Sequence, residues 1–331
     1  MIASGWAVRV LLSISICSLC CPCSTLEVRA LRRNFDIDEH VSLNLDPSKV
    51  AWLHIAKTGT SWINTLATWG CPQMPNDSSL PDSTPGEGRD ELGWLNGLID
   101  HGQCKPDLNI SGFLRRHAPL GVLDRHELQD HAGNWVTMLR QPEQRIISGF
   151  HHGKHDYPGN DVNMTVYAPA VAGCQVRMML GKPCGPGNSH RFEGYSLVRE
   201  EDVDHAIRVV EEEFAFVGIT EEWALSVCLF HKMFGGSCHQ REFLNVRPGE
   251  SHSSDEYETD ILEGFIDEAD GKLYAKALQI FSSNLHSFGV SRESCTSICS
   301  AFPDPFLNSL QVSTSMAEIS SEGRIALEGN F

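Results

Sequence analysis

The order of apolar and polar positions along the chain predicts strands that alternate with helices. Three short and almost continuous apolar runs, at 49–55, 134–140 and 214–220, are typical of buried strands. Each is followed, after a tight turn, by a segment in which apolar residues recur at helical spacing. The expected helices are 61–69, 142–150, 200–214, 221–236 and 271–285. This alternation predicts an α/β fold, with a mainly parallel sheet covered by helices on both faces.

The two ends of the chain differ from this pattern. Residues 1–24 contain a single arginine, an apolar run at 10–21 and a small-residue end, as in an export signal. The run is shorter than the ~20 residues of a comfortable membrane span, so a cleaved signal peptide and a retained signal anchor both remain open. Residues 25–48 are mixed and charged, as in a stem or linker, and 49–298 are expected to form one domain. Residues 299–331 lack periodicity and are expected to form an irregular tail.

Composition narrows the ligands that the protein can bind. The chain has 331 residues, of which 41% are apolar, and this is enough for a hydrophobic core. Lys plus Arg number 26 and Asp plus Glu 43, so the formal net charge is −17. This balance argues against nucleic-acid binding, which uses a broad basic face. An anionic ligand must therefore be met by local cations.

The cysteines and three glycosylation sequons fit an exported chain. Four of the 12 cysteines lie in the N-terminal segment, and the other eight form an even set, as expected of disulfides made in an oxidising lumen. The favoured pairs are Cys174 with Cys184 and Cys228 with Cys238, because each closes a short loop rich in glycine. The Asn-x-Ser/Thr sequons lie at Asn76, Asn109 and Asn163.

One loop has the composition of an anion site. The sequence "HIAKTGTSW" places a lysine, a glycine and three hydroxyls between the first strand and the first helix, where unpaired backbone N–H groups favour anions. Its candidate ligand-binding residues are Lys57, Thr58, Gly59, Thr60 and Ser61. The loop is not a Walker A motif, because its lysine precedes the only glycine, and this disfavours a magnesium-dependent nucleotidase. A plain strand-to-helix turn would explain the glycine and the serine cap but not the lysine.

A second motif completes a family resemblance. The sequences "AKTGTS" and "RQPEQRIIS", the latter with Arg140, Pro142, Arg145 and Ser148 in register, resemble the two nucleotide-binding signatures of the Golgi membrane-bound carbohydrate sulfotransferases. "FVGITEEW" and "DGKLYAKALQIF" resemble two further stretches of that family, so the likeness runs over about 50–281. Ala56 and Gln141 depart from it, standing where Pro and Asp are usual.

The resemblance implies a fold, a reaction and a set of roles. The fold would be a P-loop-like parallel sheet flanked by helices, in a single sulfotransferase domain. The donor would be 3′-phosphoadenosine 5′-phosphosulfate (PAPS), and the acceptor would be a hydroxyl of a glycan. The 57–61 loop would bind the 5′-phosphosulfate, with Lys57 stabilising the leaving phosphate, and Arg140 with Ser148 would bind the 3′-phosphate. No metal and no nucleic acid would take part.

The motif layout is closest to heparan sulfate 2-O-sulfotransferase-like enzymes. These carry a histidine a little over twenty residues before the 3′-phosphate arginine, and His117 lies 23 positions before Arg140. His117 is the candidate base, because neutral imidazole can accept the hydroxyl proton. Arg115 stands where such enzymes often carry a second histidine, which leaves the acceptor position open. The resemblance also implies a type II membrane protein of the Golgi lumen held by its N-terminal segment, or a secreted protein if that segment is cleaved.

Other interpretations of these motifs remain open. Arg145 taken alone would suit a surface helix with Arg–Glu pairs. In "HHGKH", His151 and His155 would share a helical face and suggest zinc if the helix ran that far, whereas a solvated helix end or an acceptor-facing edge is the plainer account. The chain as a whole can also be a catalytically inactive, lumenal glycan-binding module of the same fold, or a lumenal nucleotide-dependent kinase.

Overall fold

The computed structural model describes the central part of the chain. All of the described residues lie in one compact unit. They are residues 50–59, 62, 66, 119–120, 131–188, 194–236, 238, 240–243 and 256–299. The predicted signal, the stem and the tail beyond residue 299 lie outside them. Within the described ranges, none of the helices combines the length and apolar composition that crossing a membrane requires.

The described strands form one parallel sheet. The strands are β1 (Ala51–Leu53), β2 (Trp135–Leu139) and β3 (Phe214–Ile219), in the spatial order β1-β2-β3. Both neighbouring pairs run parallel. The predicted α/β class and its parallel sheet are therefore confirmed, although each strand is shorter than its apolar run.

Burial explains why the strands are so apolar. Every residue of β1 and β2 is buried, as expected where helices cover a parallel sheet. The polar side chain in this stretch, Thr137, is satisfied across the sheet, because its hydroxyl donates to the carbonyl of Leu53 at 2.9 Å.

Seven α-helices are described, together with short 3-10 turns. The α-helices are α4 (Pro142–His151), α5 (Met164–Val171), α6 (Cys174–Met179), α7 (Glu200–Glu213), α8 (Trp223–Phe234), α9 (Glu268–Ser287) and α10 (Arg292–Ile298). The helices α4, α7, α8 and α9 confirm four of the predicted helices. Of the predicted helix 61–69 only Trp62 and Leu66 are described, and both are helical. The helices α5, α6 and α10 were not predicted.

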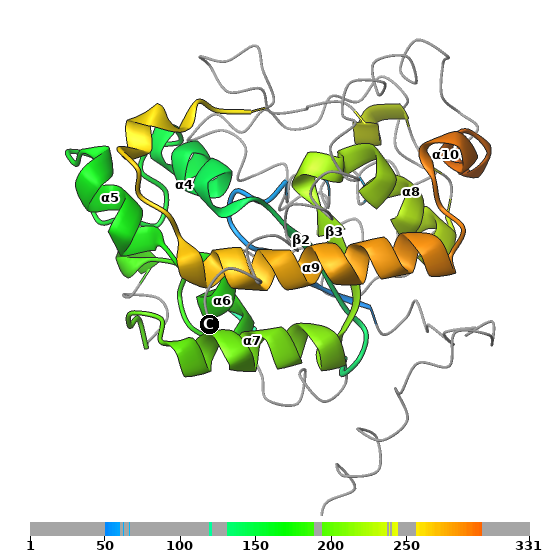
Figure 1. Ribbon diagram of the computed structural model, residues 1–331, viewed down its shortest axis with the longest axis horizontal. Coiled ribbons are helices and arrows are strands. Elements are labelled where there is room, and N and C mark those ends of the chain that lie inside the picture. The colour runs from blue at the N-terminus through cyan, green and yellow to red at the C-terminus, as the bar shows by residue number, and fades with distance from the viewer. Residues whose placement is uncertain are drawn as a thin grey trace, which may run out of the picture. The chain divides into compact units, whose positions relative to one another are not determined.

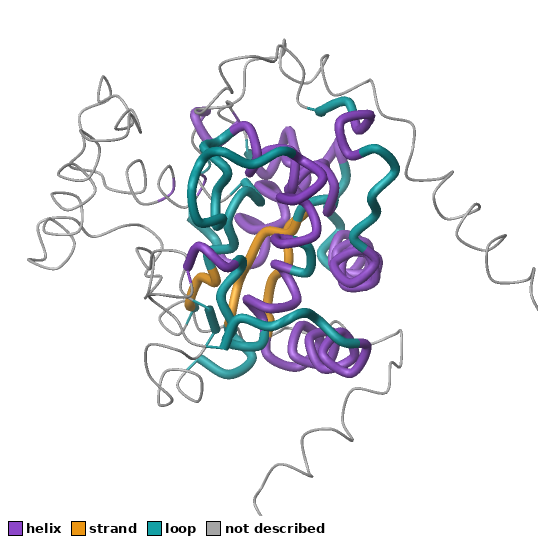
Figure 2. Tube along the Cα trace, turned by 90° about the vertical axis from the view of Figure 1, so that its left-hand side faces the viewer, coloured by secondary structure: helices purple, strands orange, loops and turns teal. Residues whose placement is uncertain are grey.

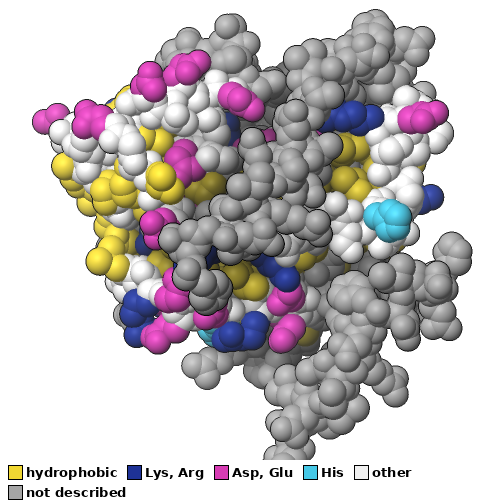
Figure 3. All heavy atoms as spheres, viewed as in Figure 1, with side chains coloured by type: hydrophobic (Ala, Val, Ile, Leu, Met, Phe, Trp, Pro, Cys, Tyr) yellow, Lys and Arg dark blue, Asp and Glu magenta, His cyan; other side chains and the backbone are white. Residues whose placement is uncertain are grey.

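Helices α7 and α9 lie side by side along one side of the sheet (Figures 1 and 2). Two ion pairs join them at the surface, Lys272 with Glu200 at 2.6 Å and Lys276 with Glu211 at 2.5 Å. Basic and acidic side chains accordingly lie next to each other at the lower edge of this face (Figure 3). Two of the many acidic side chains of the sequence are therefore neutralised by lysines at this surface.

The core is aromatic where the sheet meets α8. Trp62 packs edge-on against Trp52, Phe216 and Phe230, with ring centroids 5.1 to 6.3 Å apart. A second, smaller cluster lies between α4, α5 and the 3-10 turn η6 (Thr259–Leu262), and includes Ile146 and Tyr167. The first cluster holds the segment after the predicted anion loop, and the second holds the helix of the second motif.

One of the two favoured disulfide pairs is correct. Cys174 is bonded to Cys184, as predicted, but Cys228 is bonded to Cys295 and Cys238 to Cys299. The pairing of Cys228 with Cys238 was wrong because Cys228 lies inside α8, which continues six residues to its end and carries the chain about 9 Å away. The last two bridges fasten α10 to α8 and to the segment that follows α8.

Candidate functional site

The three strands end at one edge of the sheet, and each is followed by a stretch that the resemblance singled out. Parallel neighbours bring their carboxyl ends together, so the segments after β1, β2 and β3 meet. Thr220, directly after β3, connects the other two segments, because its hydroxyl lies 3.0 Å from the carbonyl oxygen of Thr58 and 3.0 Å from that of Leu139. We call the segments 54–59, 139–142 and 219–222 the strand-end cluster.

The segment after β1 turns sharply back on itself. Lys57 and Gly59 have φ angles of 67° and 78°, in the left-handed region. A lysine held there costs about 1 kcal/mol or more, and such outliers gather at functional sites. A Cβ on residue 59 would lie 2.5 Å from the Trp223 ring, so only glycine fits. Thr58 is fully buried and its hydroxyl lies 3.0 Å from the carbonyl of Ile55, so its hydrogen bond is made inside the turn.

Arg140 lies against the turn that contains Lys57. Its Nη1 is 3.5 Å from the Lys57 carbonyl oxygen, and its guanidinium lies over the ring of Tyr257 at 5.6 Å. The side chain of Gln175, in α6, clasps the Arg140 backbone, accepting from its N–H and donating to its carbonyl, both at 3.0 Å. The two predicted nucleotide-binding motifs therefore meet at Lys57 and Arg140, and Arg140 is held by helix α6.

Glu221 is the carboxylate next to Arg140. One oxygen accepts from the backbone N–H of Gln141 at 3.0 Å and lies 3.8 Å from Arg140 Nε, and the other accepts from the Tyr274 hydroxyl at 2.8 Å. Burial raises the pKa of Glu221, and the hydrogen bond from Tyr274 and the charge of Arg140 act in the opposite direction. Sequence reasoning quoted Thr220 and Glu221 as part of a family stretch but gave them no role. In the fold they join the three segments of the strand-end cluster.

Helix α4 begins directly after Arg140 and carries the rest of the second motif. Gln141, which stands where Asp is usual in the family, caps the helix by accepting from the Gln144 N–H at 2.7 Å. Ser148 lies two turns on and is buried. Arg145 is also buried, donating to the Val171 carbonyl at 2.7 Å, so its interpretation as a surface residue paired with glutamates was wrong.

The N-terminus of α9 supports Arg140 indirectly. Asp270 is fully buried and accepts from the backbone N–H groups of Gln175 and Val176 at 3.0 and 2.9 Å, which fixes the start of α6. Asp267, beside it, accepts from the Gly173 N–H at 2.8 Å. Burial, together with the charge of Asp270, raises the pKa of Asp267 to about 7. Two aspartates from a distant part of the chain thus hold the helix that clasps Arg140.

A second buried polar network holds the segment that follows the turn. Glu242 accepts from the Trp62 indole N–H at 2.9 Å and lies 2.9 Å from His231 Nε2. Burial lowers the pKa of His231, but the hydrogen bond and charge of Glu242 more than offset this, so the pKa is raised. The backbone carbonyl of Glu242 also accepts from the Trp223 indole at 2.7 Å. This network has no local signal in the sequence, because its members are brought together only by the fold.

Several predicted site residues lie outside the described residues. They are Thr60, Ser61 and His117, so the predicted base has no place in this description. Helix α4 ends at His151, so the helical pair of His151 with His155 that suggested zinc does not form. Among the described residues, no group of three or more His, Cys, Asp or Glu side chains has the arrangement of a metal site.

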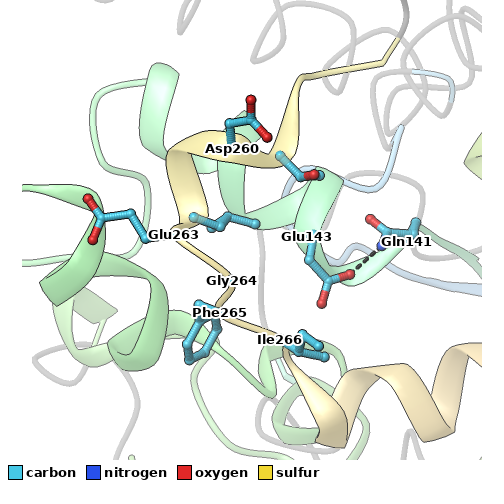
Figure 4. A pocket seen from close by; sticks show the side chains of 9 residues that line it. Gln141, Glu143, Asp260, Glu263, Gly264, Phe265 and Ile266 are labelled. Carbon is cyan, nitrogen blue, oxygen red and sulfur yellow. Dashed lines mark hydrogen bonds between the residues drawn. The ribbon is translucent and has the colours of Figure 1, made fainter.

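A pocket of about 630 Å³ lies beside the start of α4 (Figure 4). Three acidic residues, Glu143, Asp260 and Glu263, are among those that line it, and Figure 4 shows Glu143 beside Gln141, which donates to it. The turn at Lys57 does not contribute to this lining. Because acidic residues line this pocket and no lysine or arginine is among its described lining residues, it does not suit the phosphate ligand that the motifs suggest.

Comparisons with protein-family models, with curated proteins and with solved structures gave no match. The functional argument therefore depends on the residues of this chain and on the geometry of the strand-end cluster.

Proposed function

We propose that the protein is a PAPS-dependent sulfotransferase that transfers a sulfuryl group to a hydroxyl of a glycan, with the strand-end cluster as its nucleotide site. The observation that carries the proposal is the meeting of the two motifs: Arg140 Nη1 lies 3.5 Å from the Lys57 carbonyl, although 83 residues separate them. Each motif matches the same family separately, and the two lie side by side in space. A single ligand site explains this better than two unrelated turns would.

The turn at Lys57 fits a phosphate on physical grounds. Left-handed residues at positions 57 and 59 flank Thr58, and turns of this kind can direct successive backbone N–H groups toward an anion. Glycine at 59 allows the backbone to take this left-handed turn directly against the Trp223 ring, and the following segment is helical at Trp62, so a helix N-terminus adds partial positive charge.

Each cation has a separate proposed task. PAPS supplies the sulfuryl group. Lys57 holds its ammonium near the 5′-phosphate and stabilises the charge that develops there as the sulfur–oxygen bond breaks. Arg140 pairs with the 3′-phosphate, far from the reacting sulfur, and so contributes to binding. His117 accepts the proton of the acceptor hydroxyl.

Glu221 keeps Arg140 oriented for this task. Its carboxylate lies 3.8 Å from Arg140 Nε and is itself held by Tyr274 and the Gln141 N–H. An arginine that is already positioned loses less conformational freedom on binding a phosphate. The Glu221 carboxylate also competes with the 3′-phosphate for the Arg140 guanidinium. The affinity for the nucleotide therefore reflects both the orienting effect and this competition.

The nucleotide site is tested by comparing two ligands. Titration calorimetry measures adenosine 3′,5′-bisphosphate and 5′-AMP against the wild type, Arg140→Ala and the matched control Arg208→Ala, which removes an exposed arginine on α7. We expect the 3′-phosphate to tighten binding to the wild type and to the control. In Arg140→Ala that preference falls by about 2 kcal/mol, roughly thirtyfold. An unchanged preference would remove Arg140 from the site.

Transfer is tested with labelled PAPS and a panel of native and desulfated glycans. Lys57→Ala is expected to lower turnover about a hundredfold or more, whereas Lys232→Ala, at an exposed position of α8, leaves it unchanged. Binding of the bisphosphate with no transfer to any acceptor would instead identify an inactive glycan-binding module. Failure to bind the bisphosphate would overturn the proposal.

A further inference from the structure

We propose that Asn163 carries an N-linked glycan. The site goes beyond the proposed transfer reaction and depends only on export of the chain. Asn163, Met164 and Thr165 form an Asn-x-Thr sequon, the acceptor pattern for this modification in exported proteins. Of the three sequons, this one lies within the described residues, so its surroundings can be judged.

Helix α5 turns the sequon outward. The helix buries one face, formed by Met164, Tyr167, Ala168 and Val171, in the smaller apolar cluster against α4. Asn163 and Thr165 lie off this face and are exposed. Met164, the middle residue of the sequon, therefore anchors the segment. Asn163 and Thr165, which define the acceptor pattern, both point into solvent.

The side chain of Asn163 already has a structural task that leaves the acceptor atom available. As the N-cap of α5 it uses Oδ1, which accepts from the Val166 N–H at 3.1 Å and from the Thr165 hydroxyl at 2.9 Å. A glycan is joined to the other atom of the amide, Nδ2. Capping and glycosylation are therefore compatible, and the cap fixes the direction in which Nδ2 points.

The neighbourhood has room for a sugar. Residues 158–161, which lead into the helix, are all exposed. Val166, one residue beyond the sequon, is an apolar side chain that is 51% exposed. A glycan on Asn163 would shield this valine from water and from other proteins.

Transfer of the oligosaccharide to Asn163 requires one co-reactant, a glycosyl diphosphate lipid. The bond formed joins Asn163 Nδ2 to the anomeric carbon of the oligosaccharide, and the bond broken joins that carbon to the lipid diphosphate. The amide nitrogen gives up one proton, and the lipid diphosphate leaves.

The test uses the full chain produced in a eukaryotic secretory cell. Peptide mapping after enzymatic glycan release in heavy-oxygen water marks each formerly glycosylated asparagine as a heavy aspartate. We expect the mark at Asn163. A peptide that contains unmarked Asn163 in folded, exported protein would overturn the proposal, as would the absence of any glycan on the chain.

Three variants separate the glycan from the cap. Asn163→Asp keeps an oxygen that caps α5 but has no amide to modify, and Thr165→Ala removes the acceptor pattern while keeping the asparagine. Both are expected to lose one glycan on a gel, whereas Thr165→Ser keeps it. The nucleotide affinity of Asn163→Asp should equal that of the wild type, so failure of this site and failure of the proposed transfer are distinguishable. Equal gel mobility of the wild type and Asn163→Asp would contradict the inference.

Discussion

Replacing Thr220 with valine removes the hydrogen-bonding group that links the three strand ends. Valine keeps the shape of the side chain but has no hydroxyl, so it loses the single proton that Thr220 shares between the carbonyl oxygens of Thr58 and Leu139, each 3.0 Å away. Losing a hydrogen bond at this partly buried site costs about 2 kcal/mol. For a domain of this size that corresponds to a fall in Tm of roughly 4 to 8 °C.

A second threonine provides the control. Thr137 donates to the Leu53 carbonyl at 2.9 Å, so it also joins β1 and β2, but it lies within the sheet and not in the strand-end cluster. Thr137→Val should lose similar stability in urea denaturation yet bind adenosine 3′,5′-bisphosphate like the wild type. Thr220→Val should lose both stability and about tenfold in affinity, since a contribution of about 1.4 kcal/mol to positioning the turn is a tenfold change.

Thr220→Ser completes the set, because it keeps the hydroxyl and should retain most of the stability and affinity. If Thr220→Val unfolds at the wild-type midpoint, the hydroxyl does not hold the strand ends together. If Thr220→Val and Thr137→Val bind the nucleotide equally well, the strand-end cluster is not the nucleotide site.

Three further outcomes follow from the structure. Gly59→Ala should lose about 1 to 3 kcal/mol in urea denaturation, because residue 59 is left-handed and its Cβ would meet Trp223 at 2.5 Å; a wild-type midpoint would contradict this turn. The folded chain holds a proton on Asp267, beside Asp270, up to about pH 7, whereas the unfolded chain releases it near pH 4, so stability should fall as pH rises between these values. Asp267→Asn should flatten that slope in denaturation series from pH 4 to pH 8, and an equal slope would place the proton elsewhere. Cys238→Ser removes the bridge to Cys299 and should lower the free energy of unfolding by about 3 kcal/mol. The loss is limited because the bridge between Cys228 and Cys295 already joins the α8 and α10 regions and closes most of the loop. Calorimetry would show no change if Cys238 and Cys299 were not bonded.

The sequence predicted the elements whose signal is local. The strands were found because a parallel sheet covered by helices leaves a continuous apolar run, and α7 was found because Val203 and Val210 repeat on one face. Helix α5 was missed because it has only eight residues and contains Pro169. Helix α6 has six residues and depends on Asp270, almost a hundred positions away, to hold its N-terminus. Elements that long-range contacts create cannot be found from a local pattern.

Some features of the candidate site were likewise predictable from local sequence patterns, and others were not. That Lys57 and Arg140 lie at the same edge of the sheet was predictable from the alternating pattern, because parallel strands end at the same edge. That their two strands are neighbours was shown only by the structure. The groups that hold Arg140 were not predictable, since Gln175 and Tyr257 come from other segments and have no motif of their own. Glu221 lay inside a quoted stretch, but its pairing with Arg140 required the register of β2 against β3.

The clasp of Gln175 on Arg140 has a consequence for the peptide plane at the end of β2. The primary amide acts here as a substitute for a neighbouring strand, offering one donor and one acceptor to the backbone of residue 140 in the way that a peptide group would. Glutamate and methionine have similar size but cannot do both. The orientation of that peptide, and with it the direction in which the arginine leaves the sheet, is therefore encoded by a side chain 35 residues later.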